Sequence, residues 1–600
     1  MSSDTATHAQ PGRAAGQHPP AWQRRLRRFG YAGQPRPGVR ERLVPPYQEP
    51  GTRLWETLGA PPAMAARIAR WSGWGGPLLV ALVAGLTRFW RLGSPANVIF
   101  DETYYAKDAW SVWQFGYEGT WPKTANDKIL DAPQHIPLSD AASYVVHPPV
   151  GKWVIGIGEQ FFGLHAFGWR FMVALLGTLS VLMLCRIGRR LFRSTFLGCL
   201  AGALMTVDGL HYVMSRTALL DLVLMFFVLA AFGALLIDRD KARARLAAAL
   251  PSGLPSGLPE GDDGTARPDA GVAGSLKLGA RPWRLAAGVL LGLAVGTKWN
   301  GLYVLAVFGL MTVLWDIGAR RTAGAARPYR TVLRRDLPWA FLSTVPVAIV
   351  TYIVSWSGWF AASGTFSRAR GWRHSGYFRH WAESAKPDGG GYGTGGTFDW
   401  LLNPLRSLWH YETEVYKFHV GLDSPHVYQS NPWSWLVQSR PVSYFYESPR
   451  AGQEGCPKDA TEKCAREVLA LGTPLLWWAA CFAVLYLLFR WALRRDWRAG
   501  AVLAGIAAGY LPWFLYQERT IFSFYAVVFV PFLCLAVTMM IGAMLGPPGA
   551  TETRRVVGAV GAGALVLLII WNFIYFFPLY TGQTMPMDAW RARMWLDTWI

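Results

Sequence analysis

The feature that most constrains this chain is a series of long apolar segments that recurs along most of its length. About eleven of them approach the length that a helix needs to cross the roughly 30 Å hydrocarbon core of a bilayer. They lie at about 76–92, 169–184, 196–212, 218–237, 285–295, 302–315, 337–356, 473–489, 501–516, 522–545 and 556–577. The sequence therefore predicts an all-α polytopic membrane protein with about eleven transmembrane helices.

The composition supports this class, and the charge distribution argues against nucleic acid as a partner. Of the 600 residues, 52% are hydrophobic and only 16% are charged, although the formal net charge is +21. Arginines gather in short segments, for example after 169–184, 302–315 and 473–489, as topology signals do in membrane proteins. If the N-terminus is cytoplasmic, these clusters are cytoplasmic too, and an odd number of spans places the C-terminus outside.

We divide the chain into five parts. Residues 1–75, rich in Pro, Gly, Ala and Arg, are predicted to be a disordered basic cytoplasmic tail. Residues 76–358 form a transmembrane module with an outer loop at 93–168 and a cytoplasmic Pro/Gly/Ser linker at 238–282. Residues 359–471 form a large extracytoplasmic loop, 472–577 form the C-terminal transmembrane helices, and 578–600 form an extracytoplasmic tail. The large loop contains a glycine tract at 389–391 and suits a lid or a substrate-facing domain.

The first outer loop carries two adjacent carboxylates, Asp101 and Glu102, directly after the first apolar segment. Tyr105, Ala109 and Val112 follow at helical spacing, which predicts an amphipathic helix on the membrane surface. Such a helix would hold the carboxylates near lipid headgroups, where one of them can act as a base. The alternative is that they only cap the helix, because acidic side chains satisfy free N–H groups at a helix start. Both interpretations can hold together.

Cations near the outer ends of the spans are candidates to bind a phosphate-linked lipid. His147 and Lys152 lie in the string HPPVGK, before an apolar segment at 151–162 that is too short to span and is assigned to the interface. The candidates for the lipid phosphate are Lys152, Arg170, Arg216, Lys298 and Asn300. Each has a structural alternative. Lys152 and Arg170 can extend to the membrane surface, Arg216 can pair with Asp221, and 296–301 can be a simple turn.

The large outer loop holds a dense cluster of aromatic and histidine side chains. Rings at this density mark the membrane interface or stack on sugar faces. His410 and Trp433 are therefore candidates for sugar or acceptor contacts, as are His147 and Asp221. The histidines have no metal-ligand spacing, and no metal site is predicted. Cys456 and Cys464 share this loop, and their spacing leaves open whether they pair.

Five strings, in this order along the chain, resemble the protein O-mannosyltransferase family. They are FDETYYAKD, HPPVGKW, SRTALLD, GTKWNGLY and NPWSWL with the following Arg440 and Pro441. The resemblance is to the bacterial, actinobacterial type and covers essentially 80–580. The large outer loop departs from the eukaryotic pattern, because it is too short and too poor in repeats for the β-trefoil domain inserted there.

The resemblance implies a C-type glycosyltransferase fold and the transfer of mannose from polyprenyl-phosphate mannose to Ser or Thr hydroxyls of secreted proteins. It also implies inversion at the sugar by a single displacement. Asp101 would accept the hydroxyl proton and Glu102 would position the acceptor or the helix, while the cations stabilise the leaving phosphate. This chemistry requires no cofactor, and dependence on a divalent cation stays open.

The implied partners are the lipid donor, Ser/Thr-containing secreted proteins, membrane lipids and, as a further partner, the secretion machinery. The enzyme would lie in the cell membrane with its active site outside. One alternative is a C-type glycosyltransferase that acts on a glycolipid or cell-wall glycan, which would differ in the acceptor cavity. The other is a lipid or sugar transporter, which predicts internal repeats and charged mid-membrane helix breaks that the sequence lacks.

Overall fold

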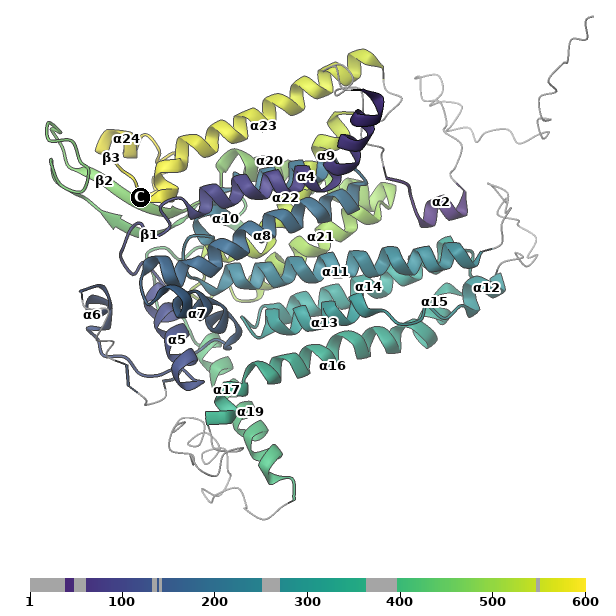
Figure 1. Ribbon diagram of the computed structural model, residues 1–600, viewed down its shortest axis with the longest axis horizontal. Helices are drawn as coiled ribbons and strands as arrows, with labels where there is room; N and C mark the ends of the chain where they lie inside the picture. Colours follow the sequence, from purple (N-terminus) through teal and green to yellow (C-terminus); the bar gives the residue numbers. More distant parts are fainter. Residues whose placement is uncertain are drawn as a thin grey trace, which may run out of the picture.

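A bundle of long helices with a small sheet at one end makes up the protein (Figure 1). The computed structural model describes residues 38–47, 61–131, 138–139, 143–250, 270–362, 397–546 and 551–600. Its α-helices are α2 (Val39–Leu43), α4 (Pro62–Phe89), α5 (Glu102–Phe115), α6 (Ala125–Asp131), α7 (Val150–Phe162), α8 (Ala166–Phe192), α9 (Thr195–Thr206), α10 (Gly209–Met214), α11 (Leu220–Ala249), α12 (Ala270–Ser275), α13 (Pro282–Val295), α14 (Gly301–Thr322), α15 (Pro328–Thr331), α16 (Leu337–Ser355), α17 (Ser357–Ala362), α19 (Asp399–Val420), α20 (Pro474–Arg494), α21 (Trp497–Tyr510), α22 (Val530–Met544), α23 (Glu552–Thr581) and α24 (Met587–Arg591).

Shorter elements complete the described chain. A π-helical turn, η1 (Val332–Asp336), joins α15 to α16. The 3-10 turns are η4 (Pro432–Ser434), η5 (Leu511–Leu515), η6 (Ser523–Phe529) and η7 (Asp597–Trp599), and the strands are β1 (Val442–Glu447), β2 (Cys464–Ala470) and β3 (Thr584–Pro586). In Figure 1, α5, α7 and the sheet lie at one end of the bundle, and α12 and α15 lie at the other.

The multi-span character predicted from the sequence is confirmed. Within the described residues, eight helices are long and apolar enough to cross a membrane: α8, α11, α14, the continuous α15–η1–α16 segment, α20, α21 with η5, η6 with α22, and α23. The predicted ranges 76–92, 196–212 and 285–295 fall on α4, on α9 with α10, and on α13, which are not among these eight. The count of eleven is therefore not confirmed.

The expected span at 196–212 is broken into two helices near a buried aspartate. α9 ends at Thr206, and the side chain of Asp208 accepts a hydrogen bond from the backbone N–H of His211 at 2.8 Å, which caps α10. The backbone N–H of Gly209 donates to Thr473 Oγ1 at 3.0 Å. A periodicity argument missed this break because the residues on both sides are apolar and buried.

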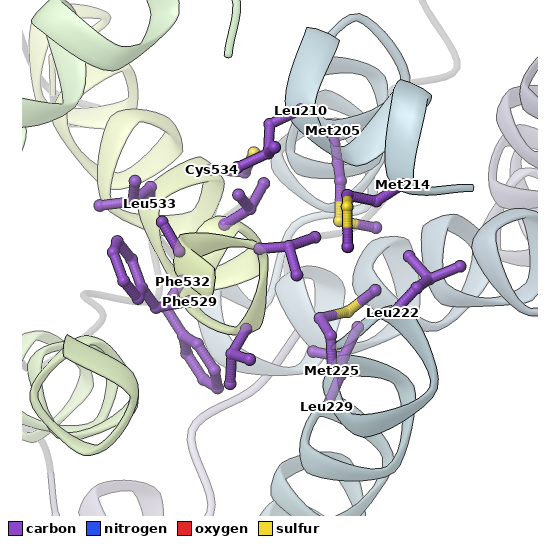
Figure 2. Close-up of a cluster of buried hydrophobic side chains, with 14 of the residues drawn as sticks. Met205, Leu210, Met214, Leu222, Met225, Leu229, Phe529, Phe532, Leu533 and Cys534 are labelled. Carbon is purple, nitrogen blue, oxygen red and sulfur yellow. The ribbon is translucent and has the colours of Figure 1, made fainter. Parts of the chain in front are cut away.

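The centre of the bundle is built from its most buried spans. In the most apolar stretch of each, 94% of the η6–α22 segment and 78% of α11 are buried, against 17% for α15–η1–α16 and 22% for α23. Figure 2 shows Met205, Met214 and Met225 in one cluster with Phe529 and Phe532, and all five are buried. The outer helices α16 and α23 therefore present most of their apolar side chains outward, as helices in contact with lipid do.

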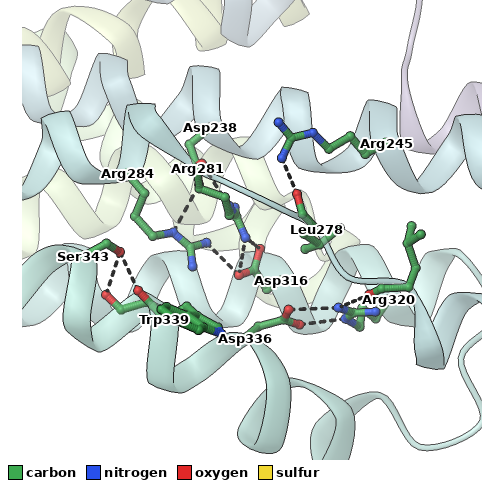
Figure 3. Close-up of polar contacts among 12 residues, drawn as sticks. Asp238, Arg245, Leu278, Arg281, Arg284, Asp316, Arg320, Asp336, Trp339 and Ser343 are labelled. Atoms are coloured by element: carbon green, nitrogen blue, oxygen red, sulfur yellow. Dashed lines mark hydrogen bonds and ion pairs between the residues drawn. The ribbon is translucent and has the colours of Figure 1, made fainter.

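A buried ionic network joins α11, α13 and α14 on the side of the bundle away from the sheet (Figure 3). Arg281 bridges Asp238 on α11 and Asp316 on α14, at 2.8 Å from the latter, and Arg284 donates to the same two carboxylates at 3.2 and 2.7 Å. Two arginines offset two aspartates, which is what permits their burial. Asp238 and Arg281 fall in the range 238–282 predicted as a linker. That prediction is wrong for 238–250, because α11 continues to Ala249, and residues 251–269 lie outside the described chain.

The structure also contains an antiparallel sheet in the order β1-β2-β3, which was not predicted from the sequence. Val442 pairs with Ala470 and Cys464 with Pro586, and a bulge interrupts β1. A disulfide joins Cys456 and Cys464 across the loop that precedes β2. The range 578–600, predicted as a tail, supplies the end of α23, β3 and α24. Trp599 is buried there and donates to the carbonyl oxygen of Gln438 at 2.7 Å.

Part of the range 1–75, predicted to be disordered, is helical. It includes α2 and the first turns of α4, which begins at Pro62. Arg243 on α11 donates to the carbonyl oxygens of Arg42 and Leu43, both at 2.9 Å, and so holds α2 against the bundle. Residues 1–37 and 48–60 lie outside the described chain, as does the glycine tract at 389–391.

The helix expected after Asp101 and Glu102 is confirmed as α5, and the apolar segment 151–162 forms α7, which packs on it. Tyr105, Ala109 and Val112 form the buried face of α5. Gly156 on α7 permits the close approach, since a Cβ atom there would lie 2.2 Å from Cδ1 of Trp113. This packing fixes the start of α5, and with it the two carboxylates, relative to the rest of the bundle.

Candidate active site

Asp101 lies at the N-cap position, directly before α5, but its side chain makes no capping hydrogen bond with the helix. The side chain is half-buried. Because it makes no cap hydrogen bond, its oxygen atoms do not have the capping role that an acid at this position often has. The preceding residue, Phe100, has a left-handed backbone with φ 47°. Its ring stacks on Tyr444 at 4.5 Å between centroids and meets Phe524 edge-on at 5.5 Å. These contacts anchor the backbone that carries Asp101.

Glu102, in contrast, is fully buried, and both of its carboxylate oxygens accept hydrogen bonds. Its two oxygens accept from Nε and Nη2 of Arg170 at 2.8 Å each, and from the backbone N–H groups of Ile99 and Ala218 at 3.1 and 3.0 Å. Arg170 also donates to loop carbonyl oxygens, those of Leu92, Pro95 and Asn97. The pair thus ties α5 to α8 and to the start of α11. This geometry favours a positioning role for Glu102 and a structural one for Arg170.

Two more of the predicted phosphate ligands donate hydrogen bonds within the fold. Arg216 donates to the backbone carbonyls of Arg88 and Trp90 at 2.7 Å each, at the end of α4. Lys152 is buried and bonds Glu118 at 2.6 Å and the carbonyl oxygen of His147 at 2.9 Å. Both cations already have strong acceptors, so these contacts favour the structural alternatives over a lipid phosphate.

Among the predicted cations, Lys298 is the one that acts electrostatically on Asp101. It forms an ion pair with Asp221 at 2.9 Å, and its ammonium lies 4.7 Å from the centre of the Tyr525 ring. The pKa of the Asp101 carboxyl is raised to about 6: burial raises it most, the positive charge of Lys298 lowers it, and the negative charge of Asp221 raises it. Asp101, Asp221 and Lys298 therefore form one electrostatic group, as expected for an acid-base site.

A cavity of about 310 Å³ adjoins this group. Lys298, Asn300 and His147, which are candidates from the sequence, line it, and Asp101 itself is not among the lining residues. Oδ1 of Asn300 is buried without a hydrogen-bond partner in the described part of the chain. The other walls are mainly aromatic and aliphatic side chains: Trp299, Leu302, Tyr303, Tyr416, Val420, Pro512, Trp513, Tyr516 and Tyr525. Such walls suit an apolar ligand with one polar end.

Two lining residues, Arg519 and His419, were not among the sequence candidates. Nε2 of His419 lies 2.7 Å from the carbonyl oxygen of Val146, so it carries the proton, and Nδ1 accepts from Nη2 of Arg519 at 3.0 Å. Burial, and then the charge of Arg519, lowers the pKa of His419 to about 4, which keeps the ring neutral. Nε of Arg519 is buried and has no partner among the described residues. Arg519 is thus a cation held in the cavity wall with a free donor.

The remaining candidates lie elsewhere. Neither His410 nor Trp433 lines the cavity. Trp433 is 73% exposed and packs edge-on against Phe514 at 4.7 Å between ring centroids. His147 does line the cavity, where it stacks on His419 at 5.1 Å, and burial lowers its pKa well below the usual value. Within the described chain, no group of three or more His, Cys, Asp or Glu side chains is placed to hold a metal ion.

Comparison with known proteins matches most of the chain. Residues 78–246 fit the family model for dolichyl-phosphate-mannose-protein mannosyltransferase, and 404–599 fit that for the C-terminal four TMM region of protein-O-mannosyltransferase. The polyprenol-phosphate-mannose–protein mannosyltransferase of Mycolicibacterium smegmatis is 37% identical over 548 residues, covering 90% of this chain and 95% of the relative. The Corynebacterium glutamicum protein of that name is 32% identical over 529 residues, 87% of this chain and 92% of its own.

A solved structure shares the fold. The Saccharomyces cerevisiae protein O-mannosyltransferase Pmt1-Pmt2 complex, bound to the sugar donor, superposes with a TM-score of 0.60 over 88% of this chain and 92% of that chain, at 14% identity. The resemblance that the five sequence strings indicated is confirmed. The chain belongs to the protein O-mannosyltransferase family and has its C-type glycosyltransferase fold.

Proposed function

We propose that this protein transfers mannose from polyprenyl-phosphate mannose to Ser or Thr hydroxyls of exported proteins, by an inverting single displacement at the extracytoplasmic face of the membrane. The names of its mycobacterial and corynebacterial relatives support the donor and the class of acceptor. The observation that carries the proposal is the position of Asp101. Its uncapped carboxylate is electrostatically coupled to Lys298, and Lys298 lines a cavity that also contains Arg519.

The steps follow from the charges of these groups. Asp101 accepts the proton of the acceptor hydroxyl while its oxygen forms a bond to the anomeric carbon of mannose. The bond from that carbon to the phosphate oxygen breaks, and the polyprenyl phosphate leaves with the electron pair. Lys298 and Arg519 stabilise the negative charge that grows on the phosphate, in a cavity where apolar walls strengthen the attraction.

Two observations support an extracytoplasmic site. The Cys456–Cys464 disulfide lies next to β2, at the same end of the bundle as α5 (Figure 1), and disulfides persist in oxidising compartments. The opposite end carries exposed arginines, such as Arg321, Arg327 and Arg330, as cytoplasmic loops do. The N-terminal end of α4 then lies on the cytoplasmic side.

The test is mannose transfer from polyprenyl-phosphate mannose to a Ser/Thr-rich peptide in membranes, with Asp101→Asn compared with wild type at matched expression. We expect a loss of roughly 10²–10⁴-fold, as is typical of a general base. Asp127→Asn removes an exposed carboxylate from α6 of the same loop and should leave the rate unchanged. Equal rates for wild type and Asp101→Asn would remove the assigned base. Labelling of a lipid or glycan but never the peptide would overturn the protein acceptor.

A further inference from the structure

A second polar pocket lies at the end of the bundle opposite Asp101. It has a volume of about 420 Å³ and opens between α12 and the α15–η1 segment. Arg327, Arg330, Arg334 and Arg335 line it, and no carboxylate does. A cavity with four guanidinium groups and no acid has a strongly positive potential, which favours an anionic ligand.

The nearby acid is already neutralised by another arginine. Asp336 accepts from Nε and Nη2 of Arg320 at 2.7 and 2.9 Å, inside the fold (Figure 3). In the described part of the chain, none of the four pocket arginines forms an ion pair with a carboxylate. Arg335 donates to the carbonyl oxygen of Ser275, which holds α12 against the pocket. The remaining donors of the pocket therefore face a ligand or water.

The spacing of the arginines is unfavourable without a ligand. Arg330 and Arg334 are four residues apart, the distance at which like charges on a helix repel each other. The π-helical turn η1 carries Arg334 and Arg335, and such turns are frequent at functional sites. The opposite wall is open, because a Cβ atom on Gly271 would meet nothing within 4 Å. An anion in this space would relieve the repulsion and has room to bind.

The level of the pocket along the bundle, relative to the lipid-facing surface, indicates which anion it binds. From Leu333 onward, the same span exposes large apolar side chains: Leu333 at 59%, Trp339 at 70% and Phe341 at 53%. Only 17% of the most apolar stretch of this span is buried, so this surface faces lipid. The arginines lie where the apolar surface begins, beside the exposed aromatic residues Tyr329 and Trp339 that are typical of the membrane interface. Lipid headgroups occupy that level.

We propose that this pocket binds the phosphate headgroup of an anionic membrane phospholipid, at a site distinct from the donor cavity. Arg330 and Arg334 contact the phosphate, and the acyl chains lie along the exposed apolar face of α16. The site is separated from Lys298 by the length of α14, which begins at Gly301 and ends at Thr322. With 22 residues, that helix is about 33 Å long, so the two ligands do not overlap.

The test is native mass spectrometry of the full-length protein in detergent, titrated with phosphatidylglycerol or with phosphatidylcholine. Wild type should bind phosphatidylglycerol preferentially, and the double variant Arg330→Gln/Arg334→Gln should bind it roughly tenfold or more weakly, since each surface arginine attracts anionic lipid. The matched control is Arg554→Gln/Arg555→Gln, which removes two exposed arginines from the start of α23. It should bind phosphatidylglycerol as wild type does.

Several results would overturn the proposal. Equal weakening by the two double variants would mean that net charge alone attracts the lipid. Equal affinity for the two lipids would mean that no headgroup site exists. If inorganic phosphate at the same concentration displaces the bound lipid, the ligand is a soluble anion. Because all four arginines are exposed, we expect the variants to fold, and Arg330→Lys/Arg334→Lys, which keeps the charge, should restore part of the binding.

Discussion

Nζ of Lys298 lies 2.9 Å from both carboxylate oxygens of Asp221, and the two residues shift the pKa of Asp101 in opposite directions. Burial raises this pKa first, Lys298 lowers it, and Asp221 raises it again. Removing either partner should therefore move the pH dependence of transfer. Asp221→Asn should shift the acid limb of the profile to lower pH, and Lys298→Met should shift it to higher pH, apart from the loss in rate that each causes.

The measurement is kcat/KM for the donor, polyprenyl-phosphate mannose, as a function of pH for both variants, at saturating acceptor peptide. Opposite shifts are the signature of an ion pair acting on a third group, because a loss of structure would reduce the rate without that sign pattern. Shifts in the same direction would contradict the coupling.

The wild-type enzyme should depend on pH through Asp101 itself. A base must be deprotonated to act, and the pKa of Asp101 is raised to about 6. We expect transfer to be level above that pH and to fall about tenfold for each pH unit below it. The residual activity of Asp101→Asn should lack this limb. A limb that persists in Asp101→Asn would belong to another group.

The Glu102–Arg170 pair should matter for stability more than for the chemical step. Glu102→Gln leaves the buried guanidinium of Arg170 without its counterion, and breaking a buried pair in this way costs about 3–5 kcal/mol. The contrasting variant is Glu462→Gln, which breaks an exposed pair with Arg591 at 3.3 Å where both side chains are 62% exposed, and should change little. Thermal unfolding in detergent measures both. A Glu102→Gln protein with normal stability but no transfer would assign Glu102 to the reaction.

Arg519 and His419 should act on the donor. Arg519→Met removes the free donor in the cavity wall and should weaken donor binding by about tenfold to hundredfold, the range expected for a hydrogen bond to a charged group. His419→Phe keeps the ring packing but removes the acceptor of Arg519 at 3.0 Å, so its effect should be smaller and in the same direction. The KM for polyprenyl-phosphate mannose measures both. An unchanged KM in Arg519→Met would exclude this arginine from the donor site.

Much of the fold was predictable because membrane spans are encoded locally. Eight of the predicted apolar ranges coincide with the eight described helices that are long and apolar enough to span a membrane, and α5 appears where its periodicity placed it. The special position of Asp101 was also readable, since an acid directly after a span must lie near the interface. The small sheet was not, because its strands are only three to seven residues long and β3 pairs with β2 across more than a hundred residues.

The site was only partly predictable, because a sequence shows which cations are present and not which acceptors they meet. Arg170 and Arg216 looked like phosphate ligands, yet their donors are occupied by Glu102 and by backbone carbonyls. Arg519 drew no notice because it lies in the short polar loop between η5 and η6. Its partner His419 is a hundred residues away and comes close only through packing of α19. The one signal of a site residue that the sequence offered was the position of Arg519, a charged residue between two long apolar segments.

The pairing of β3 with β2 bears on how the protein is made. Strands β1 and β2 leave the ribosome more than a hundred residues before β3, with four spanning segments between them. Until β3 is synthesised, β2 exposes an unpaired edge, which can pair with other chains. Translation that stalls within α23 would leave a polypeptide with all eight long spans begun and the sheet open. The sheet is therefore complete only after the last strand has been synthesised, and an open β2 edge distinguishes an unfinished chain from a finished one.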